Sequence, residues 1–176
     1  MRKLLIALTA ITLLAVCLIL LPTKTQAAET DGIYTYTVSY GKATITGFDI
    51  SFSGDLEIPA TLGGYPVTKI GDSAFRRCTE LESVTIPEGV ESIGANAFSY
   101  CYRLTSITIP SSVTSIGQSA FSYCSSLTSV TIPDSVTSID ESAFCECNNL
   151  WHVLYKGTET QWSKITICNI WGLNST

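Results

Sequence analysis

The sequence predicts a solenoid, a fold in which similar stretches of chain coil one after another around a shared core. Phenylalanine, cysteine and proline each recur with the same period of 23 residues. These markers are Phe75, Phe98, Phe121 and Phe144, then Cys78, Cys101, Cys124 and Cys147, and then Pro87, Pro110 and Pro133. A fixed period in this range is the sequence signature of stacked repeats. One unit cannot fold by itself, so several units are needed in series.

Apolar residues occupy fixed places between these markers. In one unit, Leu127, Val130 and Ile132 follow the pattern Leu-x-x-Val-x-Ile. Alternate side chains of a strand point to opposite faces. The pattern therefore predicts a short strand and its entry turn, with the apolar side chains directed inward and Ser129 and Thr131 directed outward.

The rest of the unit is predicted from the stretch that follows Pro133. Val136-x-x-Ile139 is a second, shorter stretch with inward-facing side chains. Residues 142–144, with the sequence Ser-Ala-Phe, suit one turn of α-helix or 3₁₀-helix. We therefore expect a parallel β-sheet on one face of the solenoid and short helical turns on the other.

The period divides the chain into four parts. Residues 1–27 form a signal peptide, residues 28–64 an N-terminal capping β-hairpin with a partial repeat, residues 65–156 four 23-residue repeats, and residues 157–176 a C-terminal cap. In residues 33–40 and 43–48, aromatic and β-branched residues predict two strands, joined by a turn at Gly41-Lys42. A hairpin there covers the first end of the solenoid, which otherwise exposes its core and an open sheet edge.

The C-terminal cap departs from the pattern of the repeats. Counting one period onward places Trp162 where Ile139 lies in the unit before, and Ile167 where Phe144 lies. A large indole ring at that place would close the open end of the core.

The N-terminus has a basic start, an apolar middle and a small-residue site. Two basic residues precede an apolar run over residues 4–21, and Ala27 and Ala28 follow. This order predicts a cleaved secretory signal peptide and hence a secreted or cell-surface protein. Two alternatives stay open. The run is near the lower length limit for an uncleaved membrane anchor, and Cys17 ends a stretch similar to a lipoprotein cleavage box.

The charge of the chain argues against some classes of partner. The sequence has 10 basic and 15 acidic residues. Loss of residues 1–27 removes three basic residues and no acidic one, which leaves a net charge of −8. An acidic chain without a basic cluster argues against nucleic acid and, beyond the signal segment, against membranes as partners.

The repeat units resemble a known family. Units such as LTSVTIPDSVTSIDESAFCECNN (residues 127–149) are similar to the BspA-type leucine-rich repeats of bacterial and some protist surface proteins. The flanking stretches TVSYGKATITGF and LYKGTETQWSKITI resemble segments that border such arrays. The resemblance covers residues 56 to 170. It implies a right-handed leucine-rich-repeat solenoid that is secreted or surface-displayed and acts in adhesion and binding. It carries over no catalytic residue and no binding residue.

The cysteines divide into two groups. The four at the marker position form a line of stacked residues, which suits buried reduced thiols better than a tetrahedral metal site. Cys145 and Cys168 lie outside that phase, at the place of Arg76, Ser99 and Ser122, which we expect to be exposed. They are one period apart in a chain predicted to be exported, so they are a candidate disulfide.

The outward residues of the strands form the candidate binding face. Most are serine and threonine, and the last unit replaces them by an aromatic and apolar group. They are Ser83, Ser106 and Ser129, then Thr85, Thr108 and Thr131, and then Trp151, His152 and Leu154. The polar rows also suit a solvated sheet surface, and the last group also suits packing under the cap. As a site, the face offers a hydrogen-bonding strip with an aromatic anchor at one end.

We predict a non-enzymatic binding or adhesion module, monomeric, that recognises a protein or glycan at a cell or host surface. The alternative is a structural scaffold, or a stand-alone remnant of a larger surface protein, with no ligand of its own. His152 is the only histidine, and no nucleophile–base pair or metal-ligand set can be assembled around it. We therefore expect no catalytic residue, no cofactor and no metal site.

The phenylalanine period makes one quantitative prediction. Phe121→Ala is expected to lower the free energy of unfolding by about 3–5 kcal/mol, because it removes one ring from a stacked core. Denaturant unfolding of the purified variant measures the change. A melting temperature equal to that of the parent would place the phenylalanines outside the core.

Overall fold

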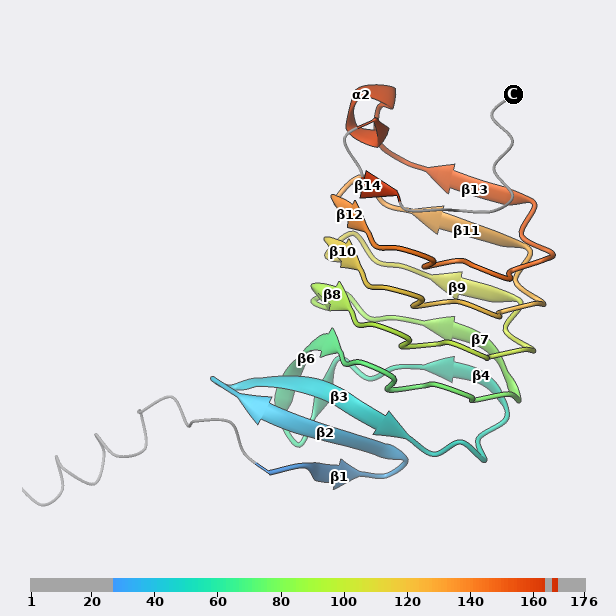
Figure 1. The fold of residues 1–176 in the computed structure, drawn as a ribbon. Helices are drawn as coiled ribbons and strands as arrows, with labels where there is room; N and C mark the ends of the chain where they lie inside the picture. Colours follow the sequence, from blue (N-terminus) through green and yellow to red (C-terminus); the bar gives the residue numbers. More distant parts are fainter. Residues whose placement is uncertain (1–26, 164–165, 168–176) are drawn as a thin grey trace, which may run out of the picture.

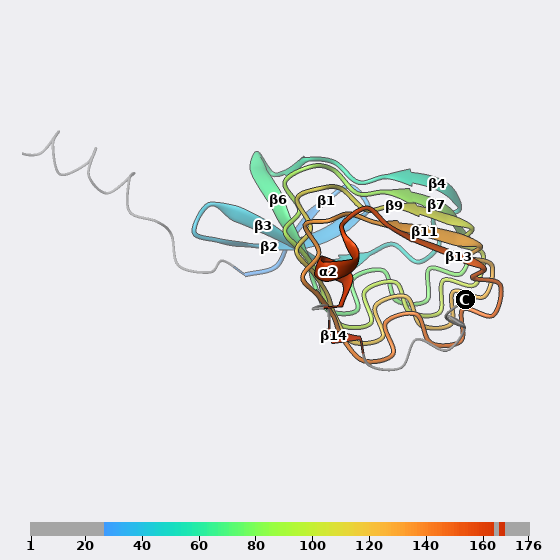
Figure 2. The same cartoon turned by 90° about the horizontal axis from the view of Figure 1, so that it is seen from above.

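The structure, a computed structural model, describes residues 27–163 and 166–167. The chain winds as a stack of coils, which confirms the predicted solenoid (Figure 1). Seen along the stack in Figure 2, a coil has three sides: a strand of one sheet, a strand of a second sheet, and a run of turns. The core lies between the three sides.

The described residues form two sheets whose neighbouring coils pair in parallel. The first sheet contains β4 (Gly54–Glu57), β7 (Leu81–Thr85), β9 (Ser106–Thr108), β11 (Ser129–Ile132) and β13 (His152–Tyr155). The second contains β1 (Glu29–Asp31), β2 (Tyr34–Ser39), β3 (Lys42–Phe48), β6 (Tyr65–Ile70), β8 (Ser92–Ile93), β10 (Ser115–Ile116), β12 (Ser138–Ile139) and β14 (Thr166–Ile167), with β5 (Thr61–Leu62) beside β6. Equivalent residues of successive coils face each other, as Val84 faces Ile107.

The second sheet and the turns differ from the prediction. The stretch from Val136 to Ile139, predicted only as a second inward-facing segment, supplies a two-residue strand, which is too short to show an alternating pattern in sequence. The predicted helical turn at the phenylalanines is absent from the described coils. Ser142 and Glu146 have φ angles of 60° and 59°, and left-handed residues on both sides of Phe144 do not allow a right-handed helix.

The phenylalanines form a ladder through the core. The ring centroids of Phe75, Phe98, Phe121 and Phe144 are 4.8, 5.4 and 5.2 Å apart in that order, and the stacked rings are within 11° of parallel. All four side chains are buried. Phe48 of β3 continues the ladder below Phe75, at 4.8 Å and a tilt of 45°. The hairpin strand therefore covers the first ring of the stack, as the position of β3 in Figure 1 also shows.

The third side is also held together by hydrogen bonds between coils. The backbone N–H groups of Ser73, Phe75 and Arg77 donate to carbonyl groups of the next coil, at 2.8–2.9 Å. The same bonds recur one coil further on, where the N–H of Phe98 donates to the carbonyl of Ala120. The turns thus satisfy their buried backbone groups without forming a helix.

The two end segments refine the prediction. The turn between β2 and β3 is at Tyr40 and Gly41, both left-handed (φ 52° and 74°), one residue earlier than expected. At the other end, β12 pairs with β14 so that Ile139 faces Ile167. The predicted equivalence of Ile167 with Phe144, and of Trp162 with Ile139, is therefore wrong, because this connection is 28 residues long instead of 23.

The extra residues include a short helix, α2 (Glu159–Trp162). The side chains of Thr158 and Gln161 form a capping box that satisfies the first backbone N–H groups. Trp162 packs against Tyr155 with ring centroids 5.1 Å apart and is partly buried. The indole does help to close this end of the core, but from the helix and not from a repeat position.

Glycine recurs where the coils of the second sheet approach most closely. Gly71, Gly94 and Gly117 are separated by the repeat period. A Cβ atom on Gly117 would lie 2.9 Å from the backbone nitrogen of Ala95, and one on Gly71 would lie 2.5 Å from the carbonyl oxygen of Ile45. A side chain at these three glycines would require atoms of the neighbouring coil to shift, whereas the next coil holds Asp140 at the same phase.

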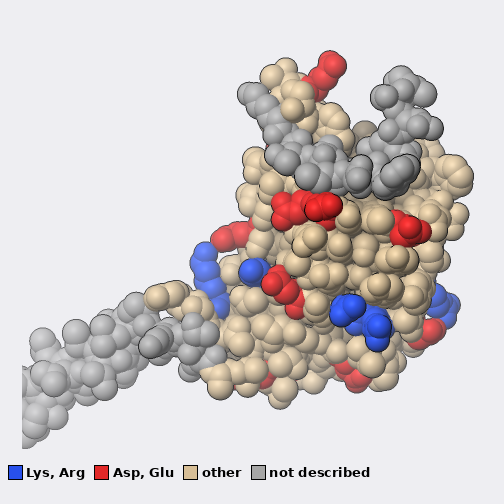
Figure 3. Space-filling model, in the orientation of Figure 1, with Lys and Arg blue, Asp and Glu red and all other residues tan. Residues whose placement is uncertain are grey.

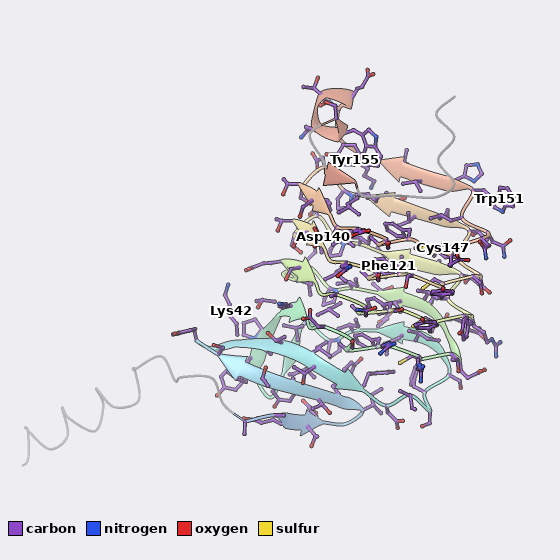
Figure 4. All side chains as sticks on the ribbon, in the orientation of Figure 1. Lys42, Phe121, Asp140, Cys147, Trp151 and Tyr155 are labelled. Carbon is purple, nitrogen blue, oxygen red and sulfur yellow. The ribbon has the colours of Figure 1, made fainter. Side chains whose placement is uncertain are left out.

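The cysteine ladder lies beside the phenylalanines and is free of disulfide bonds. In three coils the thiol donates a hydrogen bond of 3.1–3.3 Å to the carbonyl oxygen of the phenylalanine in the preceding coil. Cys147 is the last of the series (Figure 4). Burial raises the pKa of Cys78 to about 12 and also raises the pKa of Cys101. These thiols are therefore protonated and unreactive at neutral pH.

Gly117→Ala is expected to lower the free energy of unfolding by about 1–3 kcal/mol, because the added methyl group overpacks the contact with the preceding coil. Gly47→Ala is the matched control, since its Cβ atom would lie at an ordinary 3.4 Å from the Thr35 Cβ atom. Equal melting temperatures for the two variants would contradict the close approach of the coils.

The buried thiols also predict a loss of stability in alkaline solution. An unfolded thiol ionises near pH 8.5, whereas the folded Cys101 keeps its proton to higher pH. The unfolded state alone loses this proton as the pH rises, so the free energy of unfolding should fall by up to about 1.4 kcal/mol per pH unit for each such thiol.

Thermal unfolding at about pH 8 and about pH 10.5 measures this effect. The difference in melting temperature should be smaller for Cys101→Ala than for the parent. An identical difference would show that Cys101 ionises at the same pH in both states.

Candidate functional site

The outer face of the first sheet carries the two predicted polar rows. Strand pairing places Ser83 beside Ser106 and Thr85 beside Thr108, and Thr131 follows Thr108 in the next coil. All six Ser and Thr side chains of the rows are at least partly exposed on this face, and Ser129 pairs with His152 of the last strand. Ordinary strand alternation explains this, because the residues between them are buried.

The rows change character at both ends of the sheet. In β4, Asp55 pairs with Ser83 and Glu57 pairs with Thr85, so the rows begin with carboxylates. In β13, His152 continues the serine row and Leu154 continues the threonine row. The face is therefore acidic at one end, polar in the middle and partly apolar at the other end.

The predicted group at Trp151, His152 and Leu154 is exposed. Trp151 is 74% accessible and Leu154 is 60% accessible. Figure 4 shows Trp151 at the start of β13, at the edge of the molecule, while Tyr155 at the other end of the strand lies near α2. The described part of the cap packs against Tyr155 and leaves Trp151 and Leu154 uncovered.

A groove runs along the threonine row. Its volume is about 520 Å³, and it follows the place where each strand of the first sheet ends in an Ile-Pro pair. Its lining consists of Thr85, Ile86, Pro87, Glu88, Thr108, Ile109, Pro110, Ser111, Thr131, Pro133, Asp134 and Lys156. The threonines of the predicted face thus form one wall of a concave surface, and the prolines supply much of the rest.

Charged residues at this groove were missing from the sequence-based prediction. Glu88 and Asp134 directly follow Pro87 and Pro133, and Lys156 lies at the end near the last coil. Glu88 accepts a hydrogen bond of 3.4 Å from the backbone of Ser111 in the next coil. The proline period was the available signal, because a residue that follows each stacked proline must also recur at the same edge.

The second predicted site, the disulfide between Cys145 and Cys168, stays a prediction because Cys168 lies outside the described residues. The expectation that this phase is exposed is wrong for two coils. Ser99 and Ser122 are buried, and their hydroxyl groups are 3.0 Å apart. Cys145 in the next coil is partly exposed. At this phase Ser99 and Ser122 therefore face the neighbouring coil, whereas Arg76 in the first of the four coils is exposed as expected.

Ion pairs in the described residues lie away from the groove. Arg103 contacts Glu80 at 2.7 Å and Glu82 at 2.5 Å, and Lys42 contacts Glu91 at 2.9 Å. The two glutamates raise the pKa of Arg103 further. All these side chains are about half exposed, so each pair contributes little to stability.

Within the part of the chain that the structure describes, no helix is long and apolar enough to span a membrane. The predicted signal peptide, residues 1–27, lies almost wholly outside that part.

Solved structures of bacterial leucine-rich repeat proteins are similar to this chain. One from Bacteroides capillosus ATCC 29799 has 35% identity and a TM-score of 0.66, with 75% of this chain and 100% of that chain covered. A leucine rich cell surface protein from Faecalibacterium prausnitzii A2-165 has 29% identity and a TM-score of 0.63, with 80% of this chain and 42% of that one covered. The leucine-rich repeat protein of T. pallidum has 26% identity and a TM-score of 0.58, over 72% and 71% of the two chains. The comparison with curated proteins found no match.

The repeats also match a family model. The model describes a BspA type leucine rich repeat region of 6 copies and matches residues 52–170. This range includes the partial repeat before residue 65, the phenylalanine ladder and the changed last coil. The resemblance found in the repeat units is thereby confirmed, and the chain belongs to the BspA-type leucine-rich repeat family.

Proposed function

We propose that this chain is a non-enzymatic binding module that attaches to a protein or glycan partner through the outer face of the first sheet. The observation that carries the proposal is the exposure of Trp151 and Leu154 beside two rows of hydroxyl groups. Aromatic side chains that are exposed before binding and buried afterwards supply much of the energy at interfaces. The hydroxyl rows and the adjoining groove supply hydrogen bonds and shape.

The break in the repeat supports the same proposal. In the two preceding coils, threonine occupies the places of both Trp151 and Leu154: Thr128 and Thr131, then Thr105 and Thr108. Threonine suits an exposed strand position, and a large apolar side chain there adds nothing to the packing of the solenoid. A partner that covers the last strand gives these two side chains a role.

A second function is favoured by the middle of the same face. From β7 to β11 its two rows consist only of serine and threonine, side chains that a solvated sheet surface carries without any ligand. On that basis the solenoid is a scaffold that spaces other parts of a surface protein. The F. prausnitzii cell surface protein, of which this chain covers 42%, is an example of a longer chain with such a region.

We also propose a secreted or cell-surface location. The basic start and apolar run of residues 1–21 support it, and the name of the F. prausnitzii relative agrees with it. Cleavage of the signal peptide would leave residues 28–176. Fractionation of cells that express the full chain into medium, envelope and cell interior tests the proposed location. Recovery of the chain in the cell interior only, with residues 1–27 intact, would contradict the proposed location.

The binding face is tested by restoring the repeat. Trp151→Thr together with Leu154→Thr gives the last coil the residues of the earlier coils, so the fold should be kept. Retention of residues 28–176 on arrays of surface proteins and glycans should then fall by about tenfold or more. Tyr40→Asn with Ile50→Thr is the matched control, because these side chains are 72% and 64% accessible and lie near the hairpin end, and Asn tolerates the left-handed backbone of residue 40.

The two candidate functions predict different results. If the chain is a binding module, the parent chain and the control variant retain a ligand, and the double variant at Trp151 and Leu154 does not. If the parent chain retains no ligand while a known binder does, or if both double variants behave alike, the scaffold function is the better account.

A further inference from the structure

The turns between the two sheets carry an unusual series of residues. Each coil has two left-handed positions there. The first holds small polar residues, Ser73, Asn96, Ser119 and Ser142, and the second holds Arg77, Tyr100, Tyr123 and Glu146. Asparagine and other short polar residues tolerate a positive φ, whereas large side chains do so rarely. Tyr100 and Tyr123, at φ 66° and 62°, therefore occupy places that the backbone alone would give to a smaller residue.

These side chains assemble into one surface cluster. Tyr100 and Tyr123 stack with ring centroids 4.7 Å apart and 7° from parallel, and Tyr102 meets Tyr100 edge-on at 6.0 Å. The guanidinium carbons of Arg76 and Arg77 lie 5.5 and 5.8 Å from the centre of the Tyr100 ring. We call these five residues the Tyr-Arg strip. Tyr102 is 45% accessible and Tyr123 is 40% accessible, so the strip is open to solvent.

The two arginines are the distinctive charges of the strip. Arg76 and Arg77 form no ion pair with any carboxylate of the described residues, while Arg103 and Lys42 are paired with glutamates. Figure 3 shows a group of Lys and Arg atoms over the segment that joins β6 to β7, on the face formed by the turns. Two adjacent guanidinium groups without a counter-charge, in a chain with 15 acidic residues, are suited to an external anion.

We propose that the Tyr-Arg strip binds an acidic sugar, a pyranose ring that carries a carboxylate. The guanidinium groups of Arg76 and Arg77 donate hydrogen bonds to the carboxylate, a planar group that matches their geometry. Tyr102 and Tyr123 contact the C–H face of the ring and donate to its hydroxyl groups, because a tyrosine has an apolar body and a polar tip. Glu146 follows Tyr123 in the row and repels an anion, so the carboxylate lies at the arginine end.

An acidic peptide fits this surface less well than a sugar. Peptides are commonly held by main-chain hydrogen bonds to a strand edge or by a groove. The backbone N–H groups along the strip are already engaged, since Arg77 donates to Ser99, Tyr100 to Ser122 and Tyr123 to Cys145. Only side-chain donors and ring faces are left for a ligand, and these suit the polar rim and apolar face of a sugar.

This proposal is independent of the proposed binding face. The strip lies on the turns, and the binding face lies on the outer side of the first sheet, on a different side of each coil (Figure 2). Loss of one activity should therefore leave the other intact.

The experiment is calorimetric titration of the purified chain with a short oligogalacturonate. Arg76→Gln with Arg77→Gln should weaken binding by about tenfold or more, because it removes both charge-assisted contacts. Lys42→Gln with Lys69→Gln is the control, since it changes the net charge by the same amount on the paired strands β3 and β6, away from the strip. The control variant should bind as the parent does, and equal weakening in both variants would overturn the proposal in favour of a general charge effect.

Two further measurements separate the parts of the proposal. Tyr102→Ala should weaken binding of the oligogalacturonate with little change in melting temperature, because the side chain is 45% accessible and its ring meets Tyr100 edge-on. A neutral galacto-oligosaccharide of the same length should bind at least about tenfold more weakly. No binding of oligogalacturonate by the parent chain, equal binding of the neutral sugar, or equal binding of a short glutamate peptide would each overturn the assignment of an acidic sugar.

Discussion

Every coil of this protein depends on its neighbours for its hydrogen bonds. From β7 to β12, each strand pairs only with the equivalent strands of the coils before and after. The turns follow the same rule, as the N–H of Phe75 donates to Ala97 and that of Phe98 donates to Ala120. A coil taken alone would leave backbone groups unpaired and its core side chains exposed, and both are unfavourable. Stacking is therefore the condition for folding, and it explains why the same residue types recur at one spacing.

Stacking also decides which positions are free to vary. Inward residues pack against residues of the same type in the neighbouring coils. A change of side-chain volume at one phenylalanine, cysteine or leucine therefore disturbs the packing of two neighbours, which restricts substitution at these positions. Close backbone contact adds a steric requirement, seen at Gly94 and Gly117. Outward residues border the solvent, so a change in their volume displaces no core neighbour. The first sheet can therefore begin with Asp55 and end with Leu154 without loss of the fold.

The freedom of the outward positions gives the molecule two surfaces of different chemistry. The first sheet offers flat rows of hydroxyl groups, a groove along the prolines and an exposed Trp151. The turns offer stacked tyrosines and unpaired guanidinium groups. Because the repeat spacing places equivalent side chains about 5 Å apart, either surface presents its groups as a regular array. A small solenoid of this kind can serve more than one ligand without a cavity in its core.

The solenoid, its core residues and the polar rows of the first sheet could be predicted from the sequence alone, since all of these follow from one period and from strand alternation. The positions of Ser83, Thr85 and their equivalents on the outer face needed no structure. Three features became visible only in the folded chain: the second sheet, the left-handed turns beside Phe144 and the register of Ile139 with Ile167. A two-residue strand has no pattern to detect, the left-handed residues beside Phe144 are Ser142 and Glu146 instead of the glycine that would signal them, and an insertion in the last coil hides the register. The Tyr-Arg strip could also be recognised only in the folded structure, because Arg77, Tyr100 and Tyr123 have unlike side chains and come into contact only when the coils are stacked.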